Sequence, residues 1–333
     1  MILYRLYSLL LILPLTTSAL LTQERDAKAI DHYRNGYEML KTRSFRNAAE
    51  ELKAATTIDS TYGEAFYALA QAYKILNEYT KSIAAYERAY ALDIKRDAIP
   101  GQLAKLYQKE GLSSYKESKY REAIATFKKS LQFNPNNAQV HFSIGLCHDR
   151  LHNAEAAKTA YEKAIAADPT YVKVYKALGD LQRRLREYGP AAQNYKKAIT
   201  VYEKDGKLKK AARVFESIGD LYKFRRNLKE SEKHYKLAIK NHRKNKDSLG
   251  EARAMNLAGD LYMERKDFPP AGNWYKKGLD LVKNDPPHLI KALLLENMGH
   301  YFWKTKNVPE AIVQFTQARD TFSALENQMG YDH

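Results

Sequence analysis

Four side chains that could ligate a metal ion fall close together between residues 141 and 152. His148 and His152 are spaced i, i+4, which places both imidazoles on one face of a helix. His141 and Cys147 lie on the same segment, and imidazole and thiolate groups are common zinc ligands. Equivalent positions elsewhere in the chain carry aromatic rings that suit a packed core. The segment is therefore interpreted as a core helix, and no metal site is predicted.

Motifs of catalysis and cofactor binding are absent from the sequence. We find no glycine-rich phosphate loop, no G-x-S-x-G motif and no C-x-x-C motif. No catalytic residue and no cofactor are predicted, and the chain is interpreted as a non-enzyme. Cys147 is the single cysteine, so no internal disulfide can form.

The net charge of +16 is concentrated in one stretch. Residues 201–250 hold fifteen Lys or Arg against seven Asp or Glu, a net charge of +8. Two interpretations stay open: a solvated helix face, or an electrostatic surface for an acidic partner or an anionic membrane. Nucleic-acid binding is not predicted, because acids alternate with the basic residues and no reader motif is present.

A small residue recurs eight times along the chain with spacings of 34, 41, 34, 34, 40, 40 and 40 residues. Residues 12 and 19 positions later are also small. The series is Gly36, Ala70, Gly111, Gly145, Gly179, Gly219, Gly259 and Gly299. Sixteen positions after each member comes a large side chain, in order Leu52, Tyr86, Phe127, Tyr161, Tyr195, Tyr235, Tyr275 and Phe315. The pattern predicts pairs of helices that cross where the small residue lets the backbones approach and the large side chain fills the remaining space.

Short polar turns separate the two helices of each pair, and proline falls just inside the second helix at Pro190, Pro269 and Pro309. Proline is tolerated there because its missing N–H would have no partner in the first turn. The 41-residue step contains Pro100 and Gly101. It predicts a lengthened first helix over about residues 101–117 and a local kink.

This pattern resembles the tetratricopeptide repeat (TPR) family over residues 29–326. The resemblance implies an all-α, right-handed superhelical solenoid of about eight antiparallel helix pairs, with the first helices lining a concave groove. We divide the repeats into a mostly 34-residue set, residues 29–203, and a 40-residue set, residues 204–326, without predicting two independent domains. Residues 327–333 form a short tail.

The resemblance places exposed positions of the first helices in the groove, where they are candidates for peptide binding. In the 40-residue set and the repeat before it, these positions alternate in charge and end in rings. The candidates are Lys173, Asp180, Arg183, Arg213, Asp220, Lys223, Arg253, Asp260, His300 and Trp303. Their Lys and Arg side chains would grip a protein or peptide with acidic segments, or merely pair across repeats.

The groove of the first repeats is predicted to be aromatic and to favour apolar or helical ligands. Its candidate residues are Tyr33, Tyr37, Tyr67 and Phe142. The carboxylate clamp of the family's chaperone-binding members is missing, since Tyr33, Tyr37 and Ala68 occupy its equivalent positions.

Residues 1–21 resemble a signal peptide: a basic start, an apolar run from Leu6 to Leu13, Pro14, and small residues up to Ala19. An uncleaved membrane anchor is the alternative, and membrane contact is expected only through this segment. The sequence thus predicts an exported, periplasmic or envelope-associated scaffold of a bacterium. The alternative function is a sensory or regulatory repeat module that acts on a separate signalling partner. Apolar residues of the last repeat, Ile312, Phe315 and Phe322, predict self-association or a partner docked at this end.

Overall fold

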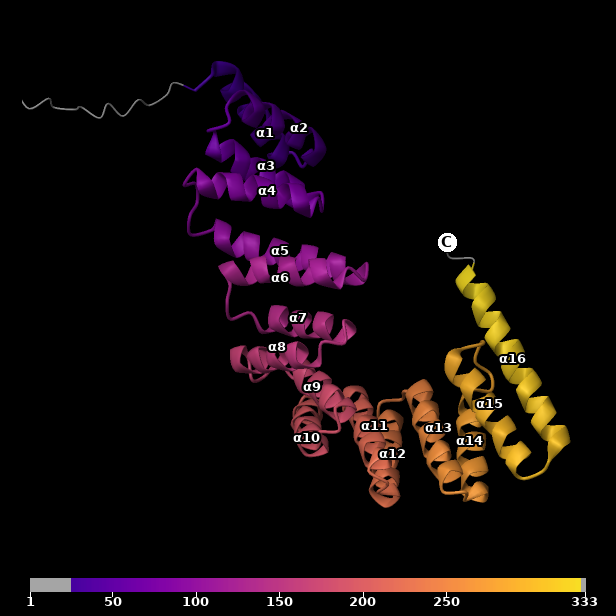
Figure 1. Cartoon of the computed structure of the whole chain (residues 1–333). Helices are drawn as coiled ribbons and strands as arrows, with labels where there is room; N and C mark the ends of the chain where they lie inside the picture. The colour runs from indigo at the N-terminus through magenta and orange to yellow at the C-terminus, as the bar shows by residue number, and fades with distance from the viewer. Residues whose placement is uncertain (1–24, 331–333) are drawn as a thin grey trace, which may run out of the picture. The chain divides into compact units, whose positions relative to one another are not determined.

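The computed structural model describes residues 25–330 and their side chains up to residue 326. This part of the chain forms sixteen α-helices and no strand, and consecutive helices pack in pairs (Figure 1). The predicted all-α solenoid of helix pairs is confirmed. The signal-like residues 1–21 lie outside the described residues. Over the residues that are described, no helix is both long and apolar enough to cross a bilayer.

Each repeat contributes a first and a second helix. The first helices are α1 (Ala27–Lys41), α3 (Gly63–Ile75), α5 (Ile99–Lys116), α7 (Ala138–Arg150), α9 (Lys173–Arg184), α11 (Leu208–Phe224), α13 (Ser248–Glu264) and α15 (Leu289–Lys304). The second helices are α2 (Phe45–Ile58), α4 (Tyr79–Ala91), α6 (Tyr120–Phe133), α8 (Ala154–Ala167), α10 (Tyr188–Lys204), α12 (Leu228–Lys244), α14 (Phe268–Val282) and α16 (Val308–Gly330). The lengthened first helix predicted at the 41-residue step is α5, with 18 residues.

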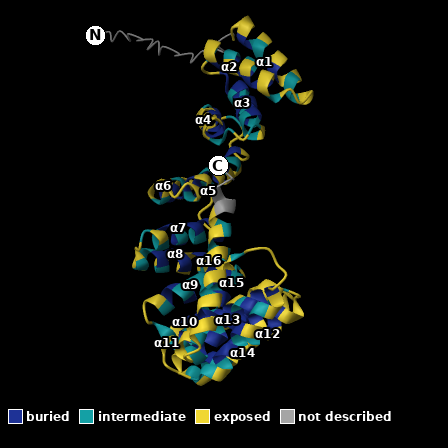
Figure 2. Ribbon diagram, turned by 90° about the vertical axis from the view of Figure 1, so that its right-hand side faces the viewer, coloured by how far each residue is buried: buried dark blue, intermediate teal, exposed yellow. Residues whose placement is uncertain are grey.

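The chain divides into two compact units, Met1–Leu106 and Tyr107–His333, with the division inside α5. The change of repeat style at residue 204 falls within the second unit. One core cluster there runs from Ala157 to Met255 and includes Tyr202, Ala211 and Val214. The core is therefore continuous across residue 204. Figure 2 shows buried residues along the helices of this cluster, α8 to α13.

Close helix crossing explains the small residues of the repeat. A Cβ atom added at Gly219 would lie 2.4 Å from the ring of Tyr235, and one at Gly259 would lie 2.3 Å from the ring of Tyr275. Real Cβ atoms do not approach other atoms so closely, because interiors are already close-packed. Glycine is required at these crossings by the ring that the second helix inserts.

Each of three buried tyrosines in the second unit donates a hydrogen bond to an aspartate on the preceding first helix. The distances from the hydroxyl to the carboxylate are 2.7 Å for Tyr195–Asp180, 2.7 Å for Tyr235–Asp220 and 2.8 Å for Tyr275–Asp260. The hydroxyl of Tyr161 is buried without a partner, since Leu146 stands where the later repeats have aspartate. Most buried hydroxyls have a hydrogen-bond partner, and for Tyr195, Tyr235 and Tyr275 the aspartate fifteen residues earlier supplies it.

Replacing Tyr161 and Tyr235 by phenylalanine is expected to have different consequences. Tyr235→Phe removes a hydrogen bond to a buried carboxylate and should cost about 1.5–3 kcal/mol. Tyr161→Phe removes an unpaired hydroxyl and should change stability by less than about 1 kcal/mol, or raise it. Thermal unfolding of the two variants measures both effects, and equal losses of stability would contradict this assignment.

Candidate functional site

A pocket of about 430 Å³ opens between three consecutive first helices of the second unit. Arg183 enters it from α9, Asp220, Lys223 and Phe224 from α11, and Glu264 from α13, while Arg226 enters from the turn after α11. We call it the first-helix pocket. Three of the predicted groove residues, Arg183, Asp220 and Lys223, meet here, although Arg183 and Lys223 are 40 residues apart in the sequence.

Arg183 lies beside the exposed aromatic ring of the pocket. Its guanidinium lies 5.3 Å from the centroid of the Phe224 ring, an arrangement in which the ring face attracts the charge. The Nε atom of Arg183 is buried without a hydrogen-bond partner. The guanidinium next to the exposed Phe224 ring offers a positive charge and a stacking surface to a ligand.

Lys223 and Arg226 share one acidic partner. The Lys223 ammonium lies 3.5 Å from a carboxylate oxygen of Glu264, and Arg226 pairs with the other oxygen. The side chain of Arg226 is 79% exposed and that of Lys223 is 30% exposed. The Arg226 side of this arrangement is exposed and its ion pair is therefore weak, whereas Lys223 and Glu264 are only partly exposed. An incoming carboxylate can compete with Glu264 for these cations.

Asp220, like Glu264, is an acidic side chain that lines the pocket. Burial raises the pKa of its carboxyl above the ordinary value, and the hydrogen bond from Tyr235 and the charges of Arg183 and Lys223 oppose that shift. In the next repeat, burial likewise raises the pKa of Asp260. These carboxyls are held by the fold and do not point freely into solvent, so the groups available to a ligand are mainly cationic.

Arg253, another predicted groove residue, belongs to a buried charge cluster beneath the first helices. Its guanidinium pairs with Glu216 at 2.8 Å, and Glu216 also lies 2.9 Å from Nε2 of His242. The other imidazole nitrogen, Nδ1, lies 2.9 Å from Asp247, which Lys209 approaches at 3.2 Å. The cluster ties α11, α12 and α13 together.

The remaining charged and ring candidates lie apart from the pocket. Lys173 and Arg213 are exposed on α9 and α11, and Asp180 pairs with Lys176 at 2.7 Å besides accepting from Tyr195. On α15, His300 packs edge-on against Phe315 at 5.0 Å, and Trp303 is 58% exposed. A binding role for these residues stays a prediction.

The aromatic candidates mostly pack within helix pairs. In the first unit, Tyr33 stacks on Tyr37 at 5.9 Å, and Tyr67 meets the buried Tyr86 edge-on at 5.7 Å. Of Tyr33, Tyr37 and Tyr67, only Tyr37 is exposed. In the second unit, Phe142 contacts Tyr161 and joins the core cluster. The apolar groove predicted from these rings stays a prediction.

The histidines near Cys147 are not gathered into a ligand set. In the part of the chain that the structure covers, no three His, Cys, Asp or Glu side chains are placed to hold a metal ion. Cys147 is buried, and burial raises the pKa of its thiol to about 11. Burial lowers the pKa of His148, and His141 bonds to the backbone oxygen of Pro135 at 2.9 Å.

The groove prediction missed Arg226, because that residue lies in the turn after α11 and not on a helix. Its backbone has a φ of 59°, and the equivalent turn residue of the next repeat, Lys266, has a φ of 60°. A repeated basic residue at the turn was the available signal.

Comparisons with known proteins agree with this fold. Residues 63–93 match the tetratricopeptide repeat model, residues 111–151 match the TPR repeat model, and residues 151–279 match that of the soluble NSF attachment protein, SNAP. Over residues 63–93 and 111–151 the chain is therefore similar to tetratricopeptide repeats, and its helix pairs agree with that similarity. No curated protein matches the chain.

Two solved structures illustrate the similarity. BtubC from P. vanneervenii is 17% identical, with a TM-score of 0.52 over 62% of this chain and 90% of that one. A tetratricopeptide repeat protein from Parabacteroides merdae is 17% identical, with a TM-score of 0.48 over 89% of this chain and 94% of that one. At these identities the likeness to BtubC concerns the fold alone.

Proposed function

We propose that this chain is a non-enzymatic scaffold that holds an acidic peptide segment in the first-helix pocket. The observation that carries the proposal is the convergence of Arg183, Lys223 and Arg226 from two consecutive repeats. Guanidinium and ammonium groups bind carboxylates through charge-assisted hydrogen bonds. The Phe224 ring is 64% exposed beside them and offers an apolar contact to the same peptide.

Acidic side chains or a terminal carboxylate fit this pocket better than basic ones. A bound carboxylate replaces Glu264 as the partner of Lys223 and Arg226, so no cation is left unpaired on binding. The first helices of successive repeats present such positions along a line, and an extended peptide can follow them.

Site-specific crosslinking provides the direct test. A photoreactive phenylalanine analogue in place of the exposed Phe224 captures what occupies the pocket in the source cells, and mass spectrometry identifies the crosslinked segment. We expect an acidic peptide segment of another protein. Crosslinks only to basic segments, or only to nucleotides or lipids, would overturn the proposal.

The affinity of the captured segment should fall when a cation of the pocket is removed and rise when the carboxylate of Glu264 is removed. Lys223→Ala is expected to weaken binding by about tenfold, or ~1.4 kcal/mol, because a cationic partner is lost. Glu264→Gln should strengthen binding by a similar factor, because the competing carboxylate is removed. Fluorescence anisotropy measures both, with Lys276→Ala as a control, because Lys276 is exposed on the second helix α14 and does not line the pocket. Equal effects of both pocket substitutions would exclude carboxylate recognition.

Two finer proposals concern location and assembly. We propose export to the bacterial envelope through residues 1–21, which cell fractionation and the mass of the mature N-terminus would decide. We further propose self-association through the last repeat. In the described side chains of α16 only Ala311 and Ala318 are buried, whereas Ile312 is 61% exposed. Light scattering across a concentration series tests this, and a constant monomer mass would exclude it.

A further inference from the structure

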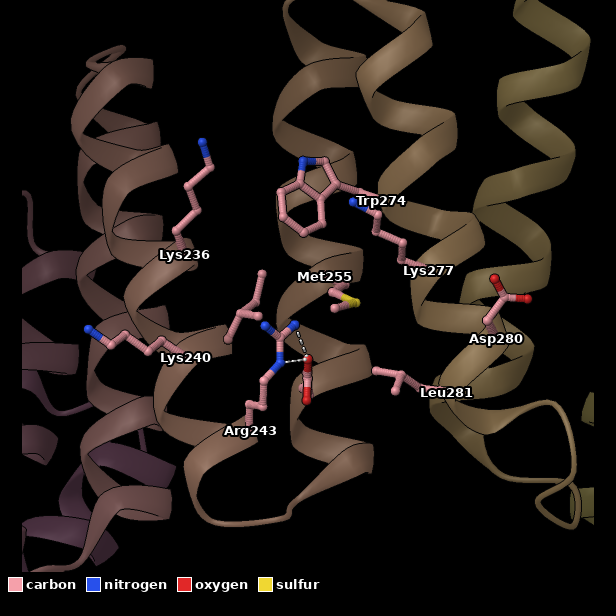
Figure 3. Close-up of a pocket in the computed structure, with 10 residues that line it drawn as sticks. Lys236, Lys240, Arg243, Met255, Trp274, Lys277, Asp280 and Leu281 are labelled. Atoms are coloured by element: carbon pink, nitrogen blue, oxygen red, sulfur yellow. Dashed lines mark hydrogen bonds and ion pairs between the residues drawn. The ribbon is translucent and has the colours of Figure 1, made fainter.

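A second and larger concavity of about 750 Å³ lies between α12 and α14, over the N-terminal half of α13. We call it the second-helix cleft. Figure 3 shows Lys236, Lys240 and Arg243 on one wall and Trp274, Lys277, Asp280 and Leu281 on the other. Its full lining is Lys236, Ile239, Lys240, Arg243, Glu251, Met255, Trp274, Lys277, Asp280 and Leu281.

The floor of the cleft is apolar. Ile239 and Met255 are buried below it, and Leu281 stands exposed at one side. The indole of Trp274 is half-buried against the core. The two preceding repeats carry His234 and Asn194 at the position of Trp274, so packing of the repeat does not itself require an indole. Trp and Met beside an apolar floor are typical of the centre of an interface.

The rim of the cleft is cationic. Four basic side chains face two acidic ones, a net charge of +2. Glu251 is already neutralised by Arg243, whose Nε and Nη2 atoms donate to it at 2.9 and 2.6 Å. The Lys277 ammonium lies 5.3 Å from the centroid of the Trp274 ring. Lys240 has no carboxylate partner in the described part of the chain.

The cleft and the first-helix pocket lie on opposite sides of α13. Met255 lines the cleft and Glu264 lines the pocket. Nine residues separate them, and at about 100° per residue they point about 180° apart around the helix. Occupying one site therefore leaves the other open.

We infer that the second-helix cleft binds an acidic amphipathic helix of a partner protein. On α12 the basic residues recur at i, i+4 and i+7, and on α14 Trp274, Lys277 and Leu281 recur at i, i+3 and i+7. Each wall thus presents about two helical turns, or roughly 10 Å, in parallel. A helix laid between the walls places apolar side chains on Met255 and Ile239 and acidic ones beside the lysines.

The shape of the site favours a protein ligand over a membrane. Met255 is 3% exposed and lies between two helices, where a flat bilayer surface does not reach. A membrane would contact the lysine tips alone and leave the apolar floor unused. Lys236, Lys240 and Arg243 belong to the strongly basic stretch 201–250. The role that this inference gives to that stretch is to attract the acidic side chains of the bound helix.

The test is a selection of displayed peptides on the full chain, followed by sorting of the enriched clones by variant. Lys240→Glu and Lys277→Glu reverse two exposed charges of the cleft. Lys276→Glu makes the same change on the neighbouring residue, which does not line the cleft, and is the matched control. Loss of binding with Lys223→Ala identifies the clones that bind the first-helix pocket. Vesicles of phosphatidylserine with phosphatidylcholine, and of phosphatidylcholine alone, are tested in parallel.

We expect clones with an apolar stripe flanked by glutamate or aspartate that lose about tenfold or more in affinity with Lys240→Glu and Lys277→Glu. These clones should be insensitive to Lys276→Glu and Lys223→Ala. The inference is overturned if no acidic amphipathic clone depends on the two cleft lysines. It is also overturned if these substitutions abolish binding to phosphatidylserine vesicles and to no peptide. Because pocket-dependent clones are scored separately, failure of this inference is distinguishable from failure of the proposed function.

Discussion

The substitution His242→Leu is expected to lower the free energy of unfolding of α11–α13 by about 1.5–3 kcal/mol. The imidazole is fully buried and contacts Glu216 and Asp247 on opposite sides at 2.9 Å. Leucine fills a similar volume but donates to neither carboxylate. Each carboxylate then loses one partner, while Glu216 keeps Arg253 and Asp247 keeps Lys209. Losing a hydrogen bond to a buried charged group is destabilising.

Amide hydrogen exchange of the full chain measures this loss where it occurs, since repeat arrays unfold locally as well as globally. The control is Lys236→Ala, which removes an exposed ion pair with Glu232 and should cost less than about 1 kcal/mol. Faster exchange confined to α11, α12 and α13 is expected for His242→Leu. Equal effects of the two substitutions would show that the buried cluster contributes no more than a surface pair.

The second large effect is expected for Gly259→Leu at the crossing of α13 and α14. Even the first added carbon would lie 2.3 Å from the Tyr275 ring. Tyr275 is almost fully buried and its hydroxyl is bound to Asp260, so the ring has nowhere to move. We expect a loss of about 3 kcal/mol, at the upper end for overpacked cores.

Gly101→Leu provides the matched control for the same chemical change. Gly101 lies in the first turn of α5, and a Cβ atom added there has no neighbour within 4 Å. Because leucine favours helix more than glycine does, this variant should be neutral or stabilised by about 0.5–1 kcal/mol. Thermal unfolding followed by circular dichroism compares the two. Comparable destabilisation of both variants would show that the tight crossing is not the cause.

The repeat architecture could be predicted because its signals are local in sequence. A small residue and a ring sixteen positions later, as in Gly219 and Tyr235, report a contact between adjacent helices. Prolines such as Pro269 mark the start of a second helix, and the structure begins α14 at Phe268. These features depend on backbone geometry within one repeat.

The roles of the polar residues needed more than this pattern. The sequence pattern places three aspartates, Asp180, Asp220 and Asp260, at exposed groove positions. In the structure all three accept hydrogen bonds from the hydroxyls of buried tyrosines. Likewise Arg253 lies at a groove-type position but pairs with the buried Glu216. Long polar side chains can turn toward either solvent or core, and the sequence period does not distinguish these directions.

The sequence alone therefore determined the helix pairs, their crossings and the basic character of residues 201–250. Only the tertiary structure decided which cations converge, since Arg183, Lys223 and Glu264 come from three repeats. It also divided the charge between a first-helix pocket and a second-helix cleft on opposite sides of α13. The physical reason is that contacts within a repeat are set by periodicity, whereas a binding surface depends on how neighbouring repeats stack and where flexible side chains find partners.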